Sequence, residues 1–342
     1  MREIGSEFWD VPVCNKENML FPEYTQWFLS GRSALRAIIK DILQKEKIRT
    51  VAIPSWCCES MIVPFLDEGI EIVFYSVTLT GGFKQDISSV MWCDALLVMD
   101  YFGYMNSPVI EDFKGVIIRD LSHSVFFEEK QDADYYFGSL RKWCGVWTGG
   151  FAWSQDGYWL EAGNANNLKY VLLREKAMAA KSCYINKCLD ESGLVVQDKH
   201  YLGIYREAEE MLDNCGIAPA AERDIRLAKS LDINFIRSCR RGNAEILMKA
   251  FPKQLIFSEL NHNDCPLFVP IIVPDGKRNV LQDFLCKQDI YCPIHWPVSK
   301  YHCLDEKTQK LYTDEISLVC DQRYTQDDME RMIEAINSFY KE

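Results

Sequence analysis

A lysine three residues after a serine is the feature of this sequence with the clearest chemical use. Residues 139–142 read Ser-Leu-Arg-Lys and follow an apolar stretch that predicts a β-strand. A lysine beside a pocket that excludes water has a lowered pKa, and its uncharged amine can form a Schiff base with an aldehyde. Lys142 is therefore a candidate catalytic residue, and Ser139 a candidate ligand for the phosphate of an aldehyde cofactor. The alternative is a solvated lysine in a surface loop.

An acidic residue and a histidine come at the end of the preceding predicted strand. Asp120 ends the run Gly-Val-Ile-Ile-Arg-Asp, and His123 follows it by three residues. A carboxylate at the end of a buried strand is costly unless a cation or hydrogen-bond donors surround it. The protonated nitrogen of a pyridine ring would be one such partner. An N-cap of the next turn, or an ion pair with Arg119 or Arg141, is the alternative.

Two features nearer the N-terminus could bind other parts of such a cofactor. Residues 30–35 read Ser-Gly-Arg-Ser-Ala-Leu and open a predicted helix. Gly31 lets the backbone approach a ligand closely, and the first-turn amides with the Ser33 hydroxyl can bind an anion. A simple N-cap explains the same residues. Trp56 follows the next predicted strand, where its indole either stacks on a planar ring or packs in the core.

The elements that must position these residues alternate between strands and helices. Helices are predicted over residues 33–47 and 57–68 from the spacing of apolar residues. Several of the predicted strands are apolar throughout, which is typical of a mainly parallel sheet covered by helices on both faces. Ligands bind at the carboxyl edge of such a sheet, where several of these strands place polar residues. The predicted strands cover residues 50–54, 71–77, 94–100, 115–120, 134–140 and 150–154.

The rest of the chain predicts a change of architecture. After about residue 160 it becomes helix-rich and polar, and it ends in short apolar segments and a last helix over residues 326–340. We therefore expect an α/β three-layer sandwich followed by a small α+β C-terminal domain. The predicted division gives residues 1–225 to the N-terminal segment and large cofactor-binding domain, and residues 226–342 to the small domain.

Composition excludes several classes of function. The net charge of −12 argues against a nucleic-acid partner, because phosphate backbones require clustered Lys and Arg. There is no apolar run of the length that spans a membrane, and the start lacks the basic and apolar regions of a signal peptide. The 14 cysteines follow no standard zinc spacing, so we expect reduced thiols, no metal and a cytoplasmic location.

The order of these features resembles the fold-type I pyridoxal-phosphate enzymes, and most closely the DegT-type sugar aminotransferases. The order is a phosphate-type helix start, an aromatic residue after the next strand, a strand-end Asp, and a Ser-x-x-Lys before a glycine turn. The resemblance runs from about Gly31 to Met332 and is firmest over residues 31–155. Its clearest stretches are SGRSALRAII, VIIRDLSHS and FGSLRKWCGVWTGG.

The resemblance assigns a role to each candidate residue. It implies that Lys142 forms the Schiff base with pyridoxal 5'-phosphate and carries protons, while Asp120 pairs with the pyridinium nitrogen. It also implies that His123 touches the ring or its phenolic oxygen and that Trp56 stacks on the ring face. The residues implied to hold the phosphate are Gly31, Arg32, Ser33 and Ser139.

The same resemblance implies a reaction and an assembly. The expected reaction moves an amino group from an amino acid, taken to be glutamate, to a keto group on a nucleotide-linked sugar. The expected assembly is a homodimer with its sites near the subunit boundary. Weaker candidates for contact with the substrate are His295, in a His-Trp-Pro turn, and Arg323.

Two other functions stay open at this level. A lyase, decarboxylase or desulfurase acting on an amino acid would use the same cofactor and needs a group for the substrate carboxylate. Arg32, Arg226 or Arg323 could supply that group. A non-catalytic binding protein on the same fold is the third possibility, because fold does not fix function.

Overall fold

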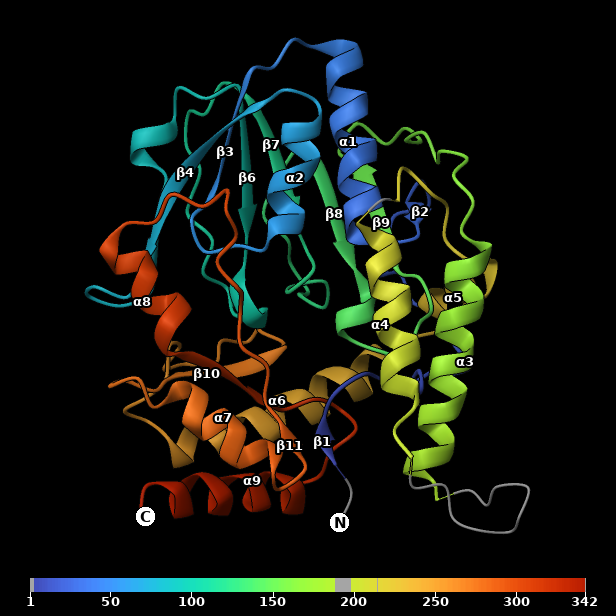
Figure 1. Ribbon diagram of the computed structural model, residues 1–342. Coiled ribbons are helices and arrows are strands. Elements are labelled where there is room, and N and C mark those ends of the chain that lie inside the picture. The colour runs from blue at the N-terminus through green and yellow to red at the C-terminus, as the bar shows by residue number, and fades with distance from the viewer. Residues whose placement is uncertain (1–2, 188–197, 214, 342) are drawn as a thin grey trace.

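A mainly parallel sheet forms the centre of the chain. The computed structural model describes residues 3–187, 198–213 and 215–341. Within them the strands of the main sheet lie in the order β2-β9-β8-β7-β6-β3-β4-β5 (Figure 1). The first, in chain order, are β2 (Gln26–Phe28), β3 (Thr50–Pro54), β4 (Glu71–Thr78) and β5 (Lys84–Asp86). The others are β6 (Ala95–Met99), β7 (Val116–Asp120), β8 (Tyr135–Ser139) and β9 (Gly150–Ser154).

The strands β3, β4, β6, β7 and β8 are parallel, and the edges are not. β9 lies antiparallel between β8 and β2, and β5 is antiparallel to β4. The central strand β6 is buried along its whole length, as a strand covered on both faces must be. The bounds of β3, β4, β6, β7, β8 and β9 lie within one residue of the stretches predicted from the sequence, whereas the edge strands β2 and β5 were not predicted.

Helices cover both faces of the sheet. On one face lie α1 (Gly31–Lys45) and α2 (Glu59–Asp67), and α1 buries Leu35, Ile38 and Ile42 at helical spacing. Burial of each such side chain contributes about 1.5–3 kcal/mol. On the other face, α5 (Glu222–Lys229) and the start of α6 (Ile233–Ala250) pack on a cluster that contains Trp143 and Trp153. This arrangement is the predicted three-layer α/β sandwich.

Two long helices stand beside the sheet. α3 (Leu168–Ile185) and α4 (Tyr201–Leu212) pack against each other next to the β2 end of the sheet (Figure 1). Tyr170 and Ala208 are part of the buried cluster that joins them to the rest of the chain. Among the described helices, none is both long and apolar enough to cross a membrane.

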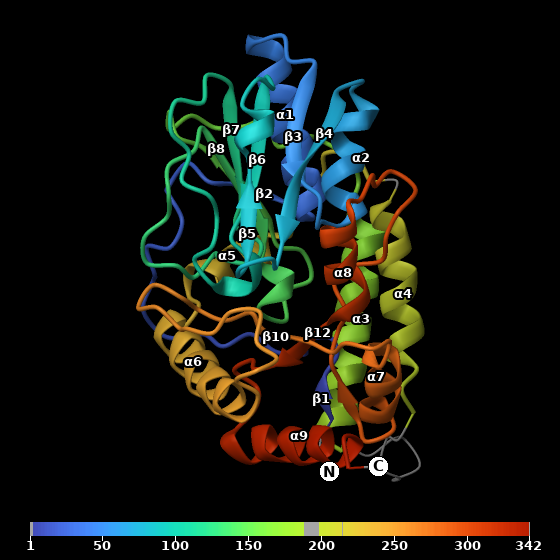
Figure 2. The same cartoon turned by 90° about the vertical axis from the view of Figure 1, so that its left-hand side faces the viewer.

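A smaller α+β part lies below the carboxyl edge of the sheet (Figures 1 and 2). It has its own core, which begins with Ile4 and otherwise spans residues 244–336. β1 (Ile4–Gly5) pairs parallel with β11 (Ile290–Tyr291), and β10 (Phe268–Ile272) pairs antiparallel with β12 (Glu315–Val319). The helices of this part are α6, α7 (Arg278–Cys286), α8 (Glu306–Asp314) and α9 (Gln326–Phe339).

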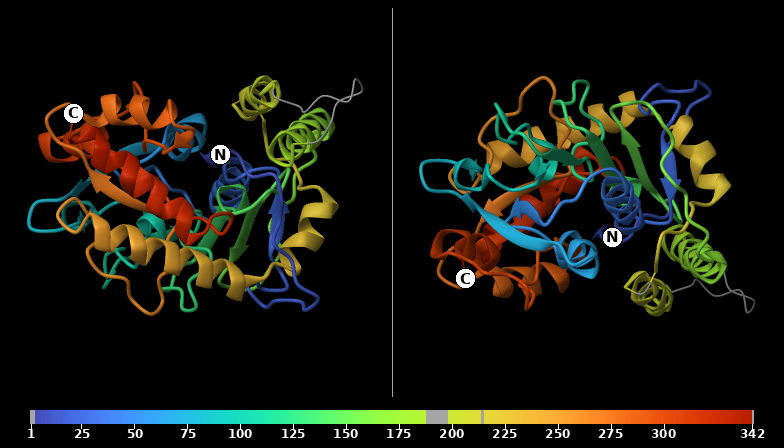
Figure 3. Two further views of the ribbon diagram at one scale, coloured as in Figure 1. Left: turned by 90° about the horizontal axis from the view of Figure 1, so that it is seen from below. Right: turned by 90° about the horizontal axis from the view of Figure 1, so that it is seen from above.

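The N-terminal strand therefore lies with the C-terminal part of the chain, which Figure 3 shows from below, with α9 in red running across it. The predicted boundary at residue 225 stays a prediction. The described residues also contain three short 3₁₀ helices, η1 (Ser88–Val90), η2 (Tyr101–Gly103) and η3 (Leu140–Lys142).

Candidate active site

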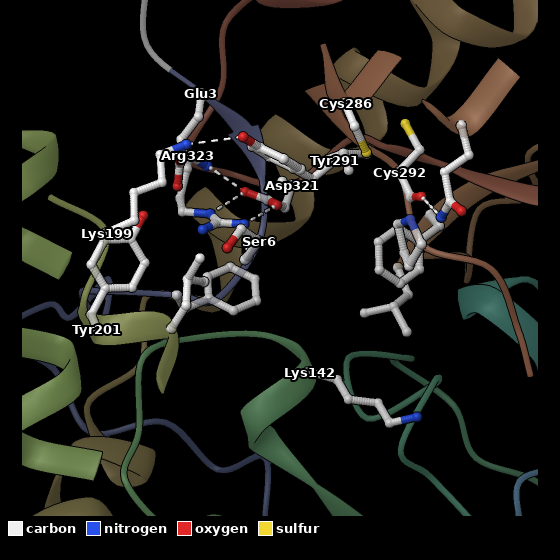
Figure 4. A pocket seen from close by; sticks show the side chains of 18 of the residues that line it. Glu3, Ser6, Lys142, Lys199, Tyr201, Cys286, Tyr291, Cys292, Asp321 and Arg323 are labelled. Carbon is white, nitrogen blue, oxygen red and sulfur yellow. Dashed lines mark hydrogen bonds and ion pairs between the residues drawn. The ribbon is translucent and has the colours of Figure 1, made fainter. Parts of the chain in front are cut away.

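Lys142 lies where two cavities meet. It ends η3, directly after β8, and its side chain lines both cavities. The first, here the strand-end cavity, has a volume of about 330 Å³ and is also lined by Gly31, Asp120, His123 and Ser139. The second, here the N-terminal cavity, has a volume of about 470 Å³ and is shown in Figure 4. Its other lining residues include Glu3, Lys199, Tyr201, Asp321 and Arg323.

The amine of Lys142 contacts His123. Nζ of Lys142 lies 3.0 Å from Nε2 of His123, and the backbone N–H of Phe102 donates to Nδ1 of the same ring at 3.2 Å. Since Nδ1 accepts, the neutral ring carries its hydrogen on Nε2 and presents it to Nζ. The contact with this ring holds the Lys142 amine at the strand-end cavity.

Burial keeps His123 neutral. The side chain is fully buried, and burial lowers its pKa well below the ordinary value, with the charges of Lys142 and His295 acting in the same direction. The ring of Trp296 stacks on it at 5.7 Å between centroids. Phe102 adopts a positive φ of 55°, a conformation that is rare for a bulky residue. A strained backbone at this point fits a functional site, because it directs the Phe102 N–H to His123.

Asp120 is a buried carboxyl group without a cation. It ends β7, and its Oδ1 accepts the backbone N–H of Ser122 at 2.7 Å. Burial raises its pKa above the ordinary value, against the opposing effects of Ser122 and Lys142. No ion pair with Asp120 occurs in the part of the chain that the structure describes. The cavity thus contains an acidic group that forms no ion pair with a described residue.

The N-terminus of α1 opens into the same cavity. Ser30 caps the helix by accepting the N–H of Ser33 at 3.2 Å, and Ser30, Gly31 and Arg32 line the cavity. The first-turn amides of a helix have no intrahelical partner and attract anions. Arg32 donates to the carbonyl of Leu212 and pairs with Asp213, each at 2.8 Å. Its Nε is buried without a hydrogen-bond partner.

Glycines after Lys142 bring this helix start close. A Cβ at Gly150 would lie 2.1 Å from the carbonyl oxygen of Ser30, so only glycine lets β9 approach Ser30. Gly149 has a φ of 150°, and its carbonyl accepts the N–H of Leu140 at 2.8 Å. This turn fixes η3, and with it Lys142, relative to the N-terminus of α1.

The structure brings together most of the residues singled out from the sequence. Those that line the strand-end cavity are Gly31, Arg32, Asp120, His123, Ser139 and Lys142.

Four candidates lie elsewhere. The Ser33 hydroxyl donates to the carbonyl of Gly216 at 2.8 Å, and Ser33 is not among the cavity-lining residues. Trp56 is fully buried, is also absent from the lining, and stacks on Tyr101 at 5.1 Å. His295 is buried beside Ser317 and Glu315. Arg323 lines the N-terminal cavity.

Sequence reasoning did not assign several residues that the structure places in the strand-end cavity. Arg141 adjoins Lys142, pairs with Glu209, and has a buried Nε without a partner. Glu7 comes from the N-terminal segment, and no local pattern connects it with the site. Trp296 belongs to the His-Trp-Pro turn that was considered for the substrate opening, and here it, rather than His295, lines the cavity.

Comparison with known proteins relates the chain to a group of solved structures. No protein-family model matches the sequence, and neither does any characterised protein sequence. The Helicobacter pylori aminotransferase PseC, involved in the biosynthesis of pseudoaminic acid, matches at a TM-score of 0.62 and 14% identity, over 98% of this chain and 100% of that chain. NtdA from Bacillus subtilis, with bound cofactor PMP, matches at a TM-score of 0.62 and 14% identity, over 94% and 74%.

A third solved structure carries the name of the family that the sequence resembles. A DegT DnrJ EryC1 StrS aminotransferase from Brucella abortus matches at a TM-score of 0.59 and 13% identity, over 94% of this chain and 87% of that chain. The three matches extend over nearly the whole chain and so include both the main sheet and the smaller part below it. The chain therefore has the fold of these aminotransferases, as the resemblance predicted.

Proposed function

We propose that this chain is a pyridoxal-phosphate-dependent aminotransferase that moves an amino group from an amino acid, glutamate, to the keto group of a sugar. The observation that carries the proposal is the contact between Lys142 and the neutral His123, in one cavity with the buried carboxyl of Asp120. A reactive amine and a buried acid at the carboxyl edge of a parallel sheet form the arrangement that this chemistry requires.

The polar groups of the strand-end cavity fit the cofactor at both of its ends. Asp120 would bind the protonated pyridine nitrogen, which would supply the positive partner that the buried carboxyl lacks. The first-turn amides of Gly31 and Arg32, with the Ser139 hydroxyl, would hold the phosphate. The unpartnered Nε atoms of Arg32 and Arg141 are further donors for an anion here.

When bound, the cofactor supplies an aldehyde that reacts with amines and a ring that withdraws electrons from the α-carbon of the donor. Asp120 holds the ring nitrogen protonated. Lys142 Nζ would take the proton from the α-carbon of the donor as a base and later give it back as an acid. His123 Nε2 orients Nζ through its hydrogen, and Phe102 fixes that tautomer. Trp296 stacks on His123 and lines the same cavity.

The structural neighbours support the choice of reaction. They include a sugar aminotransferase from Micromonospora echinospora, CalS13, and the sugar aminotransferase Spr1654 from Streptococcus pneumoniae in PLP and PMP forms. Spr1654 is named only as a putative sugar aminotransferase. A sugar as acceptor is carried over from these proteins as part of the proposal, and an amino acid as donor from the sequence resemblance.

Assembly and location belong to the same proposal. We infer a homodimer, because Trp159 and, on α3, Leu168 and Leu172 expose more than half of their apolar side chains to solvent. Light scattering should give twice the monomer mass, and Leu168→Asp with Leu172→Asp should reduce it to the monomer.

We also infer a cytoplasmic location, because the thirteen cysteines within the described residues are all free thiols.

An absorbance spectrum of the purified protein tests the proposal. The wild type should take up added pyridoxal phosphate and show a yellow absorbance band, and Lys142→Ala should lose that band. Addition of glutamate should convert the band to that of the amine form of the cofactor, which a lyase would not accumulate. A wild-type protein that takes up no cofactor would contradict the proposal.

The matched control is a second lysine that is unusually reactive but lies outside the cavity. Burial lowers the pKa of Lys130 to about 8, so a larger fraction of its amine is uncharged near neutral pH than in an ordinary lysine. Lys130→Ala should keep the band and its response to glutamate. If Lys130→Ala rather than Lys142→Ala removes the band, the assigned lysine is wrong.

A further inference from the structure

A buried carboxyl group of the smaller α+β part is linked by hydrogen bonds to His295. Glu315 and Ser317 lie on β12, two residues apart, so their side chains leave the same face of the strand. Both are fully buried, and His295, which precedes Trp296 in the chain, is 9% exposed. These three residues are not among those that line the strand-end cavity, so the proposed cofactor contacts do not explain them.

Three hydrogen bonds join these side chains in a fixed direction. Oε2 of Glu315 accepts the backbone N–H of His295 at 2.9 Å, and Oε1 accepts the hydroxyl hydrogen of Ser317. Because a hydroxyl has one hydrogen, the Ser317 oxygen can only accept from Nδ1 of His295, which lies 3.1 Å away. His295 therefore carries a hydrogen on Nδ1, and both its backbone and its ring are held.

This network orients His295 more than it stabilises the fold. Both carboxyl oxygens of Glu315 accept hydrogen bonds, which is the pattern of an ionised group, and Oε1 lies 3.8 Å from Nδ1 of His295. Burial of an ionised group is costly, and replacing a buried ion pair by apolar residues is often neutral for stability. A fully bonded buried network does, however, hold its members in one orientation.

The His295 ring stands across a group of three aromatic rings. The planes of Phe102, His123 and Trp296 lie within 35° of one another. The centroid of His295 lies 5.1 Å from that of Phe102, 5.2 Å from that of Trp296 and 6.1 Å from that of His123, at interplanar angles between 74° and 81°. Because protein interiors are close-packed, a tilt of His295 would displace these rings.

The same rings hold the amine of Lys142. Nε2 of His123 lies 3.0 Å from Nζ, and the centre of the Trp296 ring lies 5.8 Å from it. The N–H of Phe102 donates to the other nitrogen of His123. The two rings that flank the lysine amine, and the residue that fixes one of them, therefore all pack against His295.

We propose that Glu315, Ser317 and His295 are positioning residues for Lys142. Glu315 and Ser317 fix the His295 ring, and that ring fixes the group of rings that holds the lysine amine. The inference rests on the proposed function and deepens it, because Lys142 is then oriented from the smaller α+β part as well as from η3. The three residues act through other side chains and touch neither cofactor nor substrate.

Nitrogen NMR of the five histidine rings tests the first step in the cofactor-free protein. Nδ1 of His295 should carry a hydrogen in the wild type and lose it in Glu315→Gln. The new amide oxygen would accept the His295 N–H and the amide nitrogen would donate to Ser317, whose hydroxyl would then donate to Nδ1. The signal of His295 is identified by its absence from His295→Phe. His302, whose Nδ1 accepts the Ser299 N–H at 3.1 Å, should be unchanged.

Mixing the cofactor-free protein with pyridoxal phosphate tests the second step. The yellow band should form about tenfold more slowly in Glu315→Gln and in Ser317→Ala, because the lysine amine is less well oriented. Affinity for pyridoxine phosphate, which has an alcohol in place of the aldehyde, should be unchanged, since its binding does not require that amine. Ser299→Ala, which removes a hydroxyl 3.0 Å from the ring of His302, is the matched control and should keep the wild-type rate.

Three results would overturn the inference. The first is a wild-type His295 without a hydrogen on Nδ1, and the second is a folded Glu315→Gln in which that hydrogen remains. The third is a rate of band formation in Ser317→Ala that equals that of Ser299→Ala, or that falls only as far as the affinity for pyridoxine phosphate falls. Ser317→Ala decides the second step if Glu315→Gln does not fold. A wild type that forms no band contradicts the proposed function, whereas a normal wild type with unaffected variants contradicts only this inference.

Discussion

At the residue scale, the surroundings of Asp120 suit its proposed function and lower the stability of the cofactor-free protein. Its raised pKa means that the folded protein keeps a proton that the unfolded chain has already lost. The free energy of unfolding therefore falls as the pH rises from the pKa of Asp120 in the unfolded chain to its higher pKa in the folded protein. Above both values the ionised carboxylate destabilises the cofactor-free fold. A buried carboxylate of this kind is stabilised where a ligand places a positive charge beside it.

Asp120→Asn should separate these two effects. The amide oxygen can still accept the Ser122 N–H, and the buried charge is gone. We expect the free energy of unfolding at pH 7, measured by denaturant titration without cofactor, to rise by about 0.5–2 kcal/mol. We expect kcat/KM for amino transfer to fall by about 100-fold or more, because the ring nitrogen loses its counter-charge.

The control is another buried carboxyl at the same edge of the sheet. Asp100 lies 3.4 Å from Arg119 and accepts the N–H groups of Asn106 and Ser107. Asp100→Asn should lower the free energy of unfolding, because it leaves Arg119 with an unpaired buried charge. A destabilised Asp120→Asn with normal turnover would contradict the role assigned to Asp120.

At the scale of elements, the start of α1 is both a structural cap and part of the proposed anion site. Ser30 satisfies the N–H of Ser33, and it lies in the strand-end cavity because Gly150 allows the close approach of β9. The stability of the helix and the binding of the cofactor phosphate therefore depend on the same few residues.

Ser30→Ala should reveal both contributions. Loss of the cap should reduce the free energy of unfolding by about 1 kcal/mol. It should also weaken the binding of pyridoxal phosphate, measured by titration of the absorbance band, because the helix start becomes less ordered. Asp232→Ala removes the corresponding cap of α6, where Asp232 accepts the N–H of Phe235 at 3.0 Å. Asp232→Ala should lower the free energy of unfolding by a similar amount and leave the affinity for pyridoxal phosphate unchanged. Equal losses of affinity in the two variants would argue against a local role of Ser30 in binding the cofactor.

At the scale of the whole molecule, the two ends of the chain are joined in one core. Ile4 is fully buried among residues of α6, α7, α9 and β12, and β1 pairs with β11. The N-terminal segment continues from there along both cavities. Ser6 and Phe8 line the N-terminal cavity, and Glu7, between them, lines the strand-end cavity. Anchoring the first strand thus completes the walls of both cavities.

Ile4→Ala should be far more damaging than its position near the terminus suggests. Truncation of a fully buried isoleucine costs about 2–5 kcal/mol, which is a large share of the stability of a domain. Denaturant unfolding followed by tryptophan fluorescence would measure it. Met19→Ala, at a side chain that is 93% exposed, is the control and should change the free energy of unfolding by less than about 0.5 kcal/mol. Similar values for the two variants would mean that β1 is not part of the core.

The sequence by itself determined most of the main sheet and predicted which residues meet at its carboxyl edge. Apolar runs and helical spacing are local properties, so β3, β4, β6 to β9 and α1 were located within a few residues, and the short edge strands β2 and β5 were not. Strand ends of a parallel sheet meet at one edge, so the order of Asp120, His123, Ser139 and Lys142 was enough to predict a common site.

Only the tertiary structure decided which of these residues line the cavity and which contacts they make. The Phe102 N–H that sets the tautomer of His123 depends on a positive φ that the residue type does not suggest. The direction of the Ser33 hydroxyl and the packing of Trp56 depend on partners distant in sequence, Gly216 and Tyr101. The pairing of the N-terminal strand with residues 290–291, and the cavity that it encloses, also arise from contacts across nearly the whole chain, which no local pattern records.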